Sequence, residues 1–178
     1  MRIDEIHVYG FGQLRDVSYR FQDGLNVIEG LNEAGKTTLM AFIRGVLFGF
    51  ESRRNPELRY APADGGKFGG AIVLTDDEGQ TVRVERIFRQ KVAGDVTVQL
   101  PDGGEEGEAF LNRLLGNMND KVFKNIFAFG LSELQQIDTL REDEINQFIY
   151  TAGTGDGETI RVVQKELRIR CFPLCSIV

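Results

Sequence analysis

An eight-residue pattern, GLNEAGKT at residues 30–37, constrains the fold of this chain more than any other feature. It fits the form G-x-x-x-x-G-K-[ST] in full. An apolar run, LNVIEG, precedes it, and apolar residues at helical spacing follow it from residue 36 to about residue 50. Glycines permit a tight turn whose backbone N–H groups face an anion, and the start of a helix adds further donors. The pattern therefore predicts a phosphate-binding loop between a strand and a helix.

The residue types in this phosphate loop (residues 30–37) predict roles toward a bound nucleotide. Lys36 is expected to reach the β- and γ-phosphates, and the Thr37 hydroxyl is expected to coordinate Mg²⁺. We therefore predict ATP and Mg²⁺ as cofactors, although no spacing in the sequence distinguishes adenine from guanine. The expected nucleotide contacts are Gly30, Asn32, Glu33, Ala34, Gly35, Lys36, Thr37 and Thr38.

Hydrolysis requires more than this loop, because an acidic residue at the end of a second strand must hold the metal ion. Asp76 is a candidate, since it follows the apolar strand AIVLT. The same DDEG stretch also fits a hairpin turn between two alternating strands, and we favour that interpretation because the next strand begins at once. A strand that enters a hairpin is poorly placed beside a phosphate loop in a parallel sheet. The predicted catalytic set is therefore incomplete.

The order of the expected elements indicates an α/β fold. Strands are expected at residues 1–14, 16–21 and 25–30, before the phosphate loop, and at 71–76, 81–89 and 96–100, after its helix. Short connections such as Asp77-Glu78-Gly79 predict hairpins between the later strands. Helices are expected around residues 108–115 and 121–125, with Asp120 as a candidate cap, and a buried strand at 126–130.

Three stretches carry a resemblance to a known family: MRIDEIHVYGFGQL, LNVIEGLNEAGKTTLMAFIRGVLFG and VFKNIFAFGLSELQ. In this order they resemble the N-terminal lobe of ABC-type ATPases of the SbcC/SMC/RecF group, and most of all the YhaN-type, SbcC-like bacterial ATPases. The resemblance covers most of residues 1–150. It implies a P-loop NTPase fold, an ABC-ATPase-like N-terminal lobe at residues 1–157 with an antiparallel β subdomain. Residues 158–178 would then start a coiled-coil helix and end in an irregular tail.

The same resemblance implies partners. In the family a C-terminal lobe supplies the signature motif, the Walker B acids and the switch histidine, none of which is found in this sequence. The completed head would pair with a second ATPase head as a homodimer, work with an SbcD-like nuclease, and act in DNA repair or chromosome handling.

Phe129-Gly130 stands where the family has Gln-Gly of the Q-loop. Gln135 or Gln136 could replace that glutamine, although a place on a helix surface is the simpler interpretation for both.

Composition and charge limit the kinds of function that this chain can have. The net charge of −6 argues against a surface coated by nucleic acid, and no apolar run approaches the roughly 18 residues that span a membrane. The two cysteines lie in the last eight residues, which fits a reducing cytoplasm.

Arg53, Arg54 and Arg59 could touch phosphate, ribose or DNA, but we interpret them as solvated loop charges. A self-contained small P-loop NTPase or phosphotransferase and a non-catalytic, nucleotide-dependent interaction module remain alternative functions.

Overall fold

The computed structural model describes residues 1–52, 54–63, 65–76 and 78–128. The chain divides into two compact units, Met1–Asn112 and Arg113–Val178, and each is considered by itself. The predicted boundary between residues 157 and 158, and the predicted coiled-coil start at 158–178, lie outside the described residues. In the described part of the chain, no helix is both long enough and apolar enough to cross a membrane.

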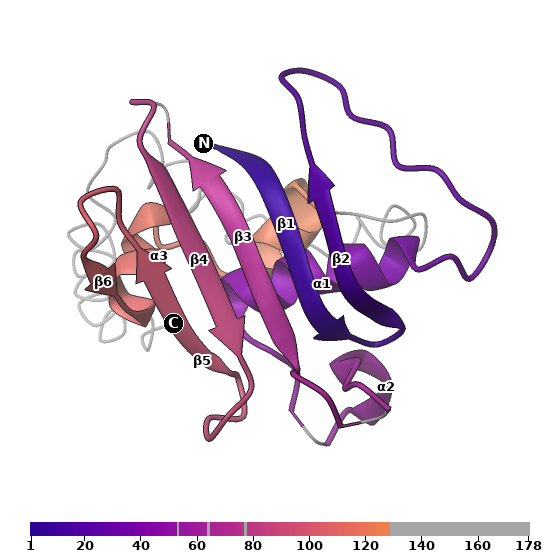
Figure 1. Ribbon diagram of the computed structural model, residues 1–178. Coiled ribbons are helices and arrows are strands. Elements are labelled where there is room, and N and C mark those ends of the chain that lie inside the picture. Colours follow the sequence, from indigo (N-terminus) through magenta and orange to yellow (C-terminus); the bar gives the residue numbers. More distant parts are fainter. Residues whose placement is uncertain (53, 64, 77, 129–178) are drawn as a thin grey trace, which may run out of the picture. The chain divides into compact units, whose positions relative to one another are not determined.

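A six-stranded sheet is the centre of the first unit (Figure 1). Its strand order is β2-β1-β3-β4-β5-β6, and every pair of neighbours is antiparallel. The strands are β1 Arg2–Phe11, β2 Leu14–Arg20, β3 Gly69–Thr75, β4 Thr81–Ile87, β5 Asp95–Gln99 and β6 Glu105–Glu106. The described residues thus form the antiparallel subdomain that was predicted, and they contain no parallel strand pair of the kind that α/β folds have.

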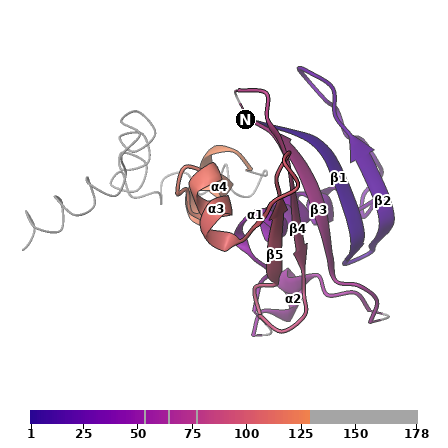
Figure 2. The same ribbon diagram turned by 60° about the vertical axis from the view of Figure 1, so that its left-hand side comes forward.

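One face of the sheet is apolar because the strand residues alternate between its two faces. Ile6 and Val8 of β1 are buried, and Ile6 is the register partner of Ile72 in β3. On the next strands, Val84 and Val98 are paired and fully buried. Helix α1, Lys36–Phe48, contacts β1, β3 and β4 and covers this face (Figure 2). The helix that follows the phosphate loop is therefore fixed on the core of the unit.

An aromatic cluster surrounds the end of β1. The ring of Phe11 lies 5.5 Å from that of Phe42 in α1, 5.3 Å from that of Tyr60 and 5.8 Å from that of Phe68. Phe42 has no exposed surface. Such aromatic pairs contribute about 0.5–1.5 kcal/mol each beyond the area that they bury. Tyr60 follows the short helix α2, Pro56–Arg59, so the cluster also holds the connection between α1 and β3.

Arg86 of β4 is the largest fully buried side chain among the described residues and is 1% exposed. Its Nε donates to the carbonyl oxygen of Val46 at 2.8 Å, near the C-terminal end of α1. Its Nη1 and Nη2 donate to the two carboxylate oxygens of Glu108 at 2.9 and 2.8 Å. A cation at the C-terminal end of a helix satisfies unpaired carbonyl groups and complements the helix dipole. The guanidinium thus joins α1 to β4 and to the start of helix α3, Glu108–Leu114.

Most predicted elements are confirmed. The predicted strands at 1–14 and 16–21 correspond to β1 and β2, and the three later strands correspond to β3, β4 and β5. The helix predicted from residue 36 ends at Phe48, and the one predicted at 108–115 is α3. The hairpin predicted at Asp77-Glu78-Gly79 joins β3 to β4, which are antiparallel neighbours.

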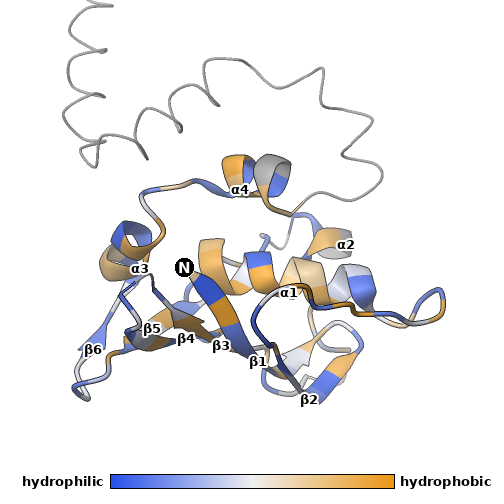
Figure 3. Cartoon of the chain, turned by 90° about the horizontal axis from the view of Figure 1, so that it is seen from above, coloured by the Kyte–Doolittle hydropathy of each residue, from blue (hydrophilic) through white to orange (hydrophobic). Residues whose placement is uncertain are grey.

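The strand predicted at residues 25–30 is wrong. These residues form no ladder with any strand of the described part, and they lie in a long connection between β2 and α1 (Figures 1 and 3). Their apolar side chains face solvent, with 92% exposure at Leu25 and 76% at Val27. The sequence has the alternation of a strand, but a strand also needs a neighbour to accept its backbone hydrogen bonds. That neighbour is absent from the described residues.

The second unit contains helix α4, Asp120–Ile126, which confirms the helix predicted at 121–125. Its cap is Asn119 and not Asp120, since the Asn119 Oδ1 accepts a hydrogen bond from the Val122 N–H at 2.8 Å. The buried strand predicted at 126–130 is wrong in its described part. Ile126 belongs to α4, and the Phe127 N–H still bonds back to the carbonyl of Phe123, so the chain there remains helical in character.

Candidate nucleotide site

The phosphate loop turns into α1 through two left-handed backbone positions. Glu33 has φ 66° and Gly35, the residue before the helix, has φ 95°. The first turn of α1 contains no acidic residue. By the geometry of an α-helix, the N–H groups of Lys36 and Thr37 have no acceptor within the helix. The loop thus presents backbone donors and the positive end of the helix dipole without a competing carboxylate on that turn.

Lys36 is folded back over its own loop. Its Nζ donates to the carbonyl oxygens of Gly30 at 2.6 Å and Leu31 at 2.8 Å. The side chain is exposed. Both acceptors are neutral carbonyl oxygens, so these two contacts leave the positive charge of the ammonium group in place at the phosphate loop. This is the arrangement that an anionic phosphate group requires.

The two threonines after Lys36 have different surroundings. Thr37 is exposed, so its hydroxyl is accessible to a metal ion bound with the phosphates. Thr38 is 8% exposed, and its Cγ2 would lie only 3.0 Å from a Cβ placed on Gly12. Thr38 therefore packs beneath the β1–β2 turn, whereas Thr37 faces the open side. The predicted metal role of Thr37 is compatible with this geometry.

The β1–β2 turn also reaches the phosphate loop through Gln13, which the sequence did not single out. Its Nε2 donates to the carbonyl oxygen of Glu33 at 2.6 Å. A Cβ on Gly35 would lie 3.0 Å from this same nitrogen and 3.1 Å from Leu14 Cδ2. The second glycine of the motif is therefore required both for its positive φ and for the close approach of the turn.

Mg²⁺ would need phosphate oxygens to complete its coordination here. In the ranges that the structure describes, no group of three or more His, Cys, Asp or Glu side chains could hold a metal ion. Magnesium in nucleotide sites keeps several waters and binds through few protein ligands plus phosphates. The exposed hydroxyl of Thr37, beside the loop that faces the phosphates, fits that mode of binding.

Residues 1–171 of the chain match the AAA domain family. The chain belongs to this family. It is also 29% identical over 168 residues to the uncharacterized protein YhaN of Bacillus subtilis (strain 168). That similarity covers 94% of this chain and 17% of YhaN, so the chain spans about a sixth of the length of that relative. The matches confirm the resemblance to the N-terminal region of a P-loop ATPase that the sequence indicated.

Within this AAA domain, Asp76 is far from the phosphate loop. Its Oδ1 accepts hydrogen bonds from the N–H groups of Glu78 and Gln80, at 3.0 and 2.8 Å, and so closes the β3–β4 turn. The neighbouring residue Thr75 pairs with Arg2, at the opposite end of β1 from the turn that touches the loop. The nine steps along β1 correspond to about 30 Å. Asp76 is therefore a turn residue, and its candidate role as the metal acid is not supported.

Two other groups of candidate residues have different outcomes. Gln135 and Gln136 lie outside the described residues. Arg59 was interpreted as a solvated charge, and this is wrong, since the side chain is 7% exposed. Its guanidinium lies 5.3 Å from the ring centroid of Phe68 and 4.6 Å from that of Phe88. Arginine stacks well on aromatic rings because its charge is delocalised and weakly hydrated. Arg59 therefore belongs to the core beside the aromatic cluster, not to a phosphate site.

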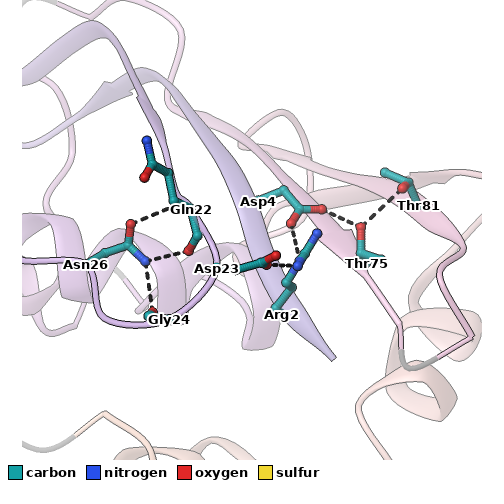
Figure 4. A network of polar contacts seen from close by, with 8 residues as sticks. All are labelled: Arg2, Asp4, Gln22, Asp23, Gly24, Asn26, Thr75 and Thr81. Atoms are coloured by element: carbon teal, nitrogen blue, oxygen red, sulfur yellow. Dashed lines mark hydrogen bonds and ion pairs between the residues drawn. The ribbon is translucent and has the colours of Figure 1, made fainter.

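The connection that enters the phosphate loop is ordered at its start by polar contacts (Figure 4). The Asn26 side chain accepts from the Gln22 N–H and donates to the Gln22 carbonyl, at 2.9 and 2.8 Å. The Arg2 guanidinium pairs with Asp23 and with Asp4. The Arg2 contacts tie the end of β2 to the first residues of β1, and the exposed apolar stretch begins at Leu25, within the turn that Asn26 closes.

Proposed function

We propose that this chain binds Mg·ATP through its phosphate loop. The observation that carries the proposal is the position of Lys36, whose uncompensated ammonium group lies over a loop at the N-terminus of α1. Lys36 would hold the β- and γ-phosphates and Thr37 would hold Mg²⁺. Gly30, Asn32, Glu33, Ala34, Gly35 and Thr38 would complete the contacts. Bound Mg²⁺ would supply charge neutralisation of the phosphates.

We further propose that the chain is the N-terminal lobe of an SbcC-like ATPase head and needs a C-terminal lobe for turnover. Three exposed apolar side chains support this: Leu25 is 92%, Val27 76% and Leu31 86% exposed. We call residues 25–31 the apolar strip. A strip of this kind, immediately before the phosphate loop, is typical of a surface that another chain segment covers. The match covers only 17% of YhaN, so a relative of this kind has a long remaining sequence that could supply such a segment.

The wider assembly is part of the same proposal. Two completed heads would bind ATP between them, and an SbcD-like nuclease and DNA would be the partners of the full assembly. A residue such as Gln135 or Gln136, or one from the C-terminal lobe, would position the attacking water. The proposed outcome is ATP turnover coupled to DNA repair or chromosome handling.

The test is a titration of the 178-residue chain with Mg·ATP, together with a measurement of steady-state turnover. We expect binding that Lys36→Ala weakens at least tenfold, because it removes the charge that faces the phosphates, and negligible turnover. Lys91→Ala is the matched control, since Lys91 is an exposed lysine in the β4–β5 connection. Equal affinity for wild type and Lys36→Ala would refute the proposed site.

The same measurement separates the two other functions considered. Lys36-dependent turnover by the chain alone would favour a self-contained NTPase or phosphotransferase. The remote position of Asp76 argues against that outcome, because the metal acid would be missing from the site. A non-catalytic interaction module would also bind without turnover. It would differ from the ATPase lobe by remaining inactive when the C-terminal lobe is supplied.

A further inference from the structure

We propose that Gln13 is a positioning residue of the nucleotide site, which holds the peptide between Glu33 and Ala34 in the orientation that phosphate binding requires. The inference rests on the proposed function, because it assigns a role in the same phosphate loop. Gln13 lies outside the loop motif and 20 residues before Glu33 in sequence.

The contact acts on the most constrained peptide of the loop. Glu33 has φ 66°, and the left-handed region is unfavourable for a residue with a Cβ. The hydrogen bond from Gln13 Nε2 to the Glu33 carbonyl is short, at 2.6 Å, and opposes the rotation that would release this conformation. Without it, the peptide could turn its carbonyl oxygen toward the anion.

The donor is itself held in place. Leu14, the next residue, is 8% exposed, and the Gly12 N–H donates to the carbonyl of Tyr60. Phe11 stacks on the Tyr60 ring with an interplanar angle of 22°. The exposed Gln13 thus lies between residues that are held, Phe11 and Gly12 by the aromatic cluster and Leu14 by its burial. A positioning group is effective only when its own support is rigid, and this turn meets that condition.

Three carbonyl oxygens of the loop accept hydrogen bonds from side chains, and that of Leu31 also accepts one from the Ala34 N–H. Lys36 binds those of Gly30 and Leu31, and Gln13 binds that of Glu33. Carbonyl oxygens carry partial negative charge and repel phosphate. Engaging them with donors lowers this repulsion. The Ala34 N–H itself donates to the Leu31 carbonyl at 3.2 Å, so the amide donors that an incoming phosphate meets are those at the start of α1. Gln13 therefore performs for the middle of the loop what Lys36 performs for its start.

The experiment compares Mg·ATP affinity of the full chain in the wild type, Gln13→Ala and Gln13→Met. Methionine has about the length of glutamine and keeps the close approach to Gly35, but it has no donor. We expect both variants to weaken binding about fivefold, the equivalent of one hydrogen bond of about 1 kcal/mol, with unchanged thermal unfolding. Gln80→Ala, an exposed glutamine in the β3–β4 turn, is the control and should bind as the wild type does.

A second readout needs no nucleotide. In the ligand-free chain, the Ala34 amide resonance should shift in Gln13→Met and stay in place in Gln80→Ala, because only the former removes a hydrogen bond from the Glu33–Ala34 peptide. Wild-type affinity in Gln13→Met would overturn the inference, and so would an unmoved Ala34 resonance. If wild type and Lys36→Ala bind equally, the proposed function fails, while the Ala34 resonance still reports on Gln13.

Discussion

Asp4 accepts two hydrogen bonds near the start of the sheet, one from the Thr75 hydroxyl and one from the Arg2 guanidinium (Figure 4). The Thr75 hydrogen bond, followed by the bond and charge of Arg2, holds the pKa of the Asp4 carboxyl below its ordinary value of 3.8. The ionised carboxylate therefore stabilises the pairing of β1 with β3 at the residue scale.

Asp4→Asn should destabilise the chain at neutral pH by about 1 kcal/mol, since it replaces a charged acceptor by a neutral one. A lowered folded-state pKa gives stability that is complete above the unfolded pKa and is lost as the pH falls through the folded value. Urea unfolding of wild type and variant should thus differ at pH 7, and the difference should disappear at an acidic pH well below 3.8. An equal difference at both pH values would contradict the role of the charge, and Thr75→Val should reduce the pH dependence.

The residues of the site differ in how far the sequence could predict them. Lys36 and Thr37 were predictable because the chemistry of the phosphate loop depends on adjacent residues. Gln13 was not, because its contact with Glu33 depends on how a distant turn folds. The burial of Arg86 could also have been predicted from the sequence. Val82 and Val84 alternate toward the core, and the same period places Arg86 on that buried face.

At the scale of the element, α1 is held at both ends. Its N-terminus is fixed by the phosphate loop and the β1–β2 turn, and its C-terminal carbonyls are bound by Arg86. Gly49 ends the helix with φ 106°, and its N–H still bonds to the Gly45 carbonyl. Position and length of the helix are therefore set by partners at each end and not by its own propensity alone.

Arg86→Met should destabilise the chain by about 3 kcal/mol, because it leaves Glu108 and helix carbonyls without their buried donor. Arg83→Met is the matched control, since Arg83 lies on the same strand but on the opposite, partly exposed face. Its loss should cost less than about 1 kcal/mol. Denaturant unfolding measures both. A similar loss in the two variants would show that Arg86 adds nothing beyond an ordinary strand arginine.

Alternation and turn residues were sufficient to predict β3, β4 and β5, because hairpin partners are adjacent in sequence. The same signals gave a wrong prediction at the apolar strip, because alternation indicates only that a segment is able to form a strand. Whether it does depends on a neighbour, and none lies beside residues 25–30 within the described ranges. Information about a partner is not contained in the segment itself.

At the scale of the whole molecule, the apolar strip contains the three most exposed large apolar side chains of the described residues, Leu25, Leu31 and Val27. Val27→Asp should leave the free energy of unfolding within about 0.5 kcal/mol of wild type, because the side chain is 76% exposed. It should lower the binding of a hydrophobic fluorescent dye. Val82→Asp, at a position 6% exposed, is the buried control and should prevent stable folding. Unchanged dye binding in Val27→Asp would contradict the strip as an exposed surface.

The pairing of β1 with β3 has a consequence for the order of events during synthesis. β2 ends at Arg20, but β3 begins only at Gly69. The phosphate loop and α1 lie within the segment that this pairing closes. A ribosome adds roughly 5–20 residues each second, so for a few seconds the nascent chain carries the loop motif without the sheet beneath it. We therefore expect competence to bind a nucleotide to arise only once β3 has emerged, well after the motif itself has been translated.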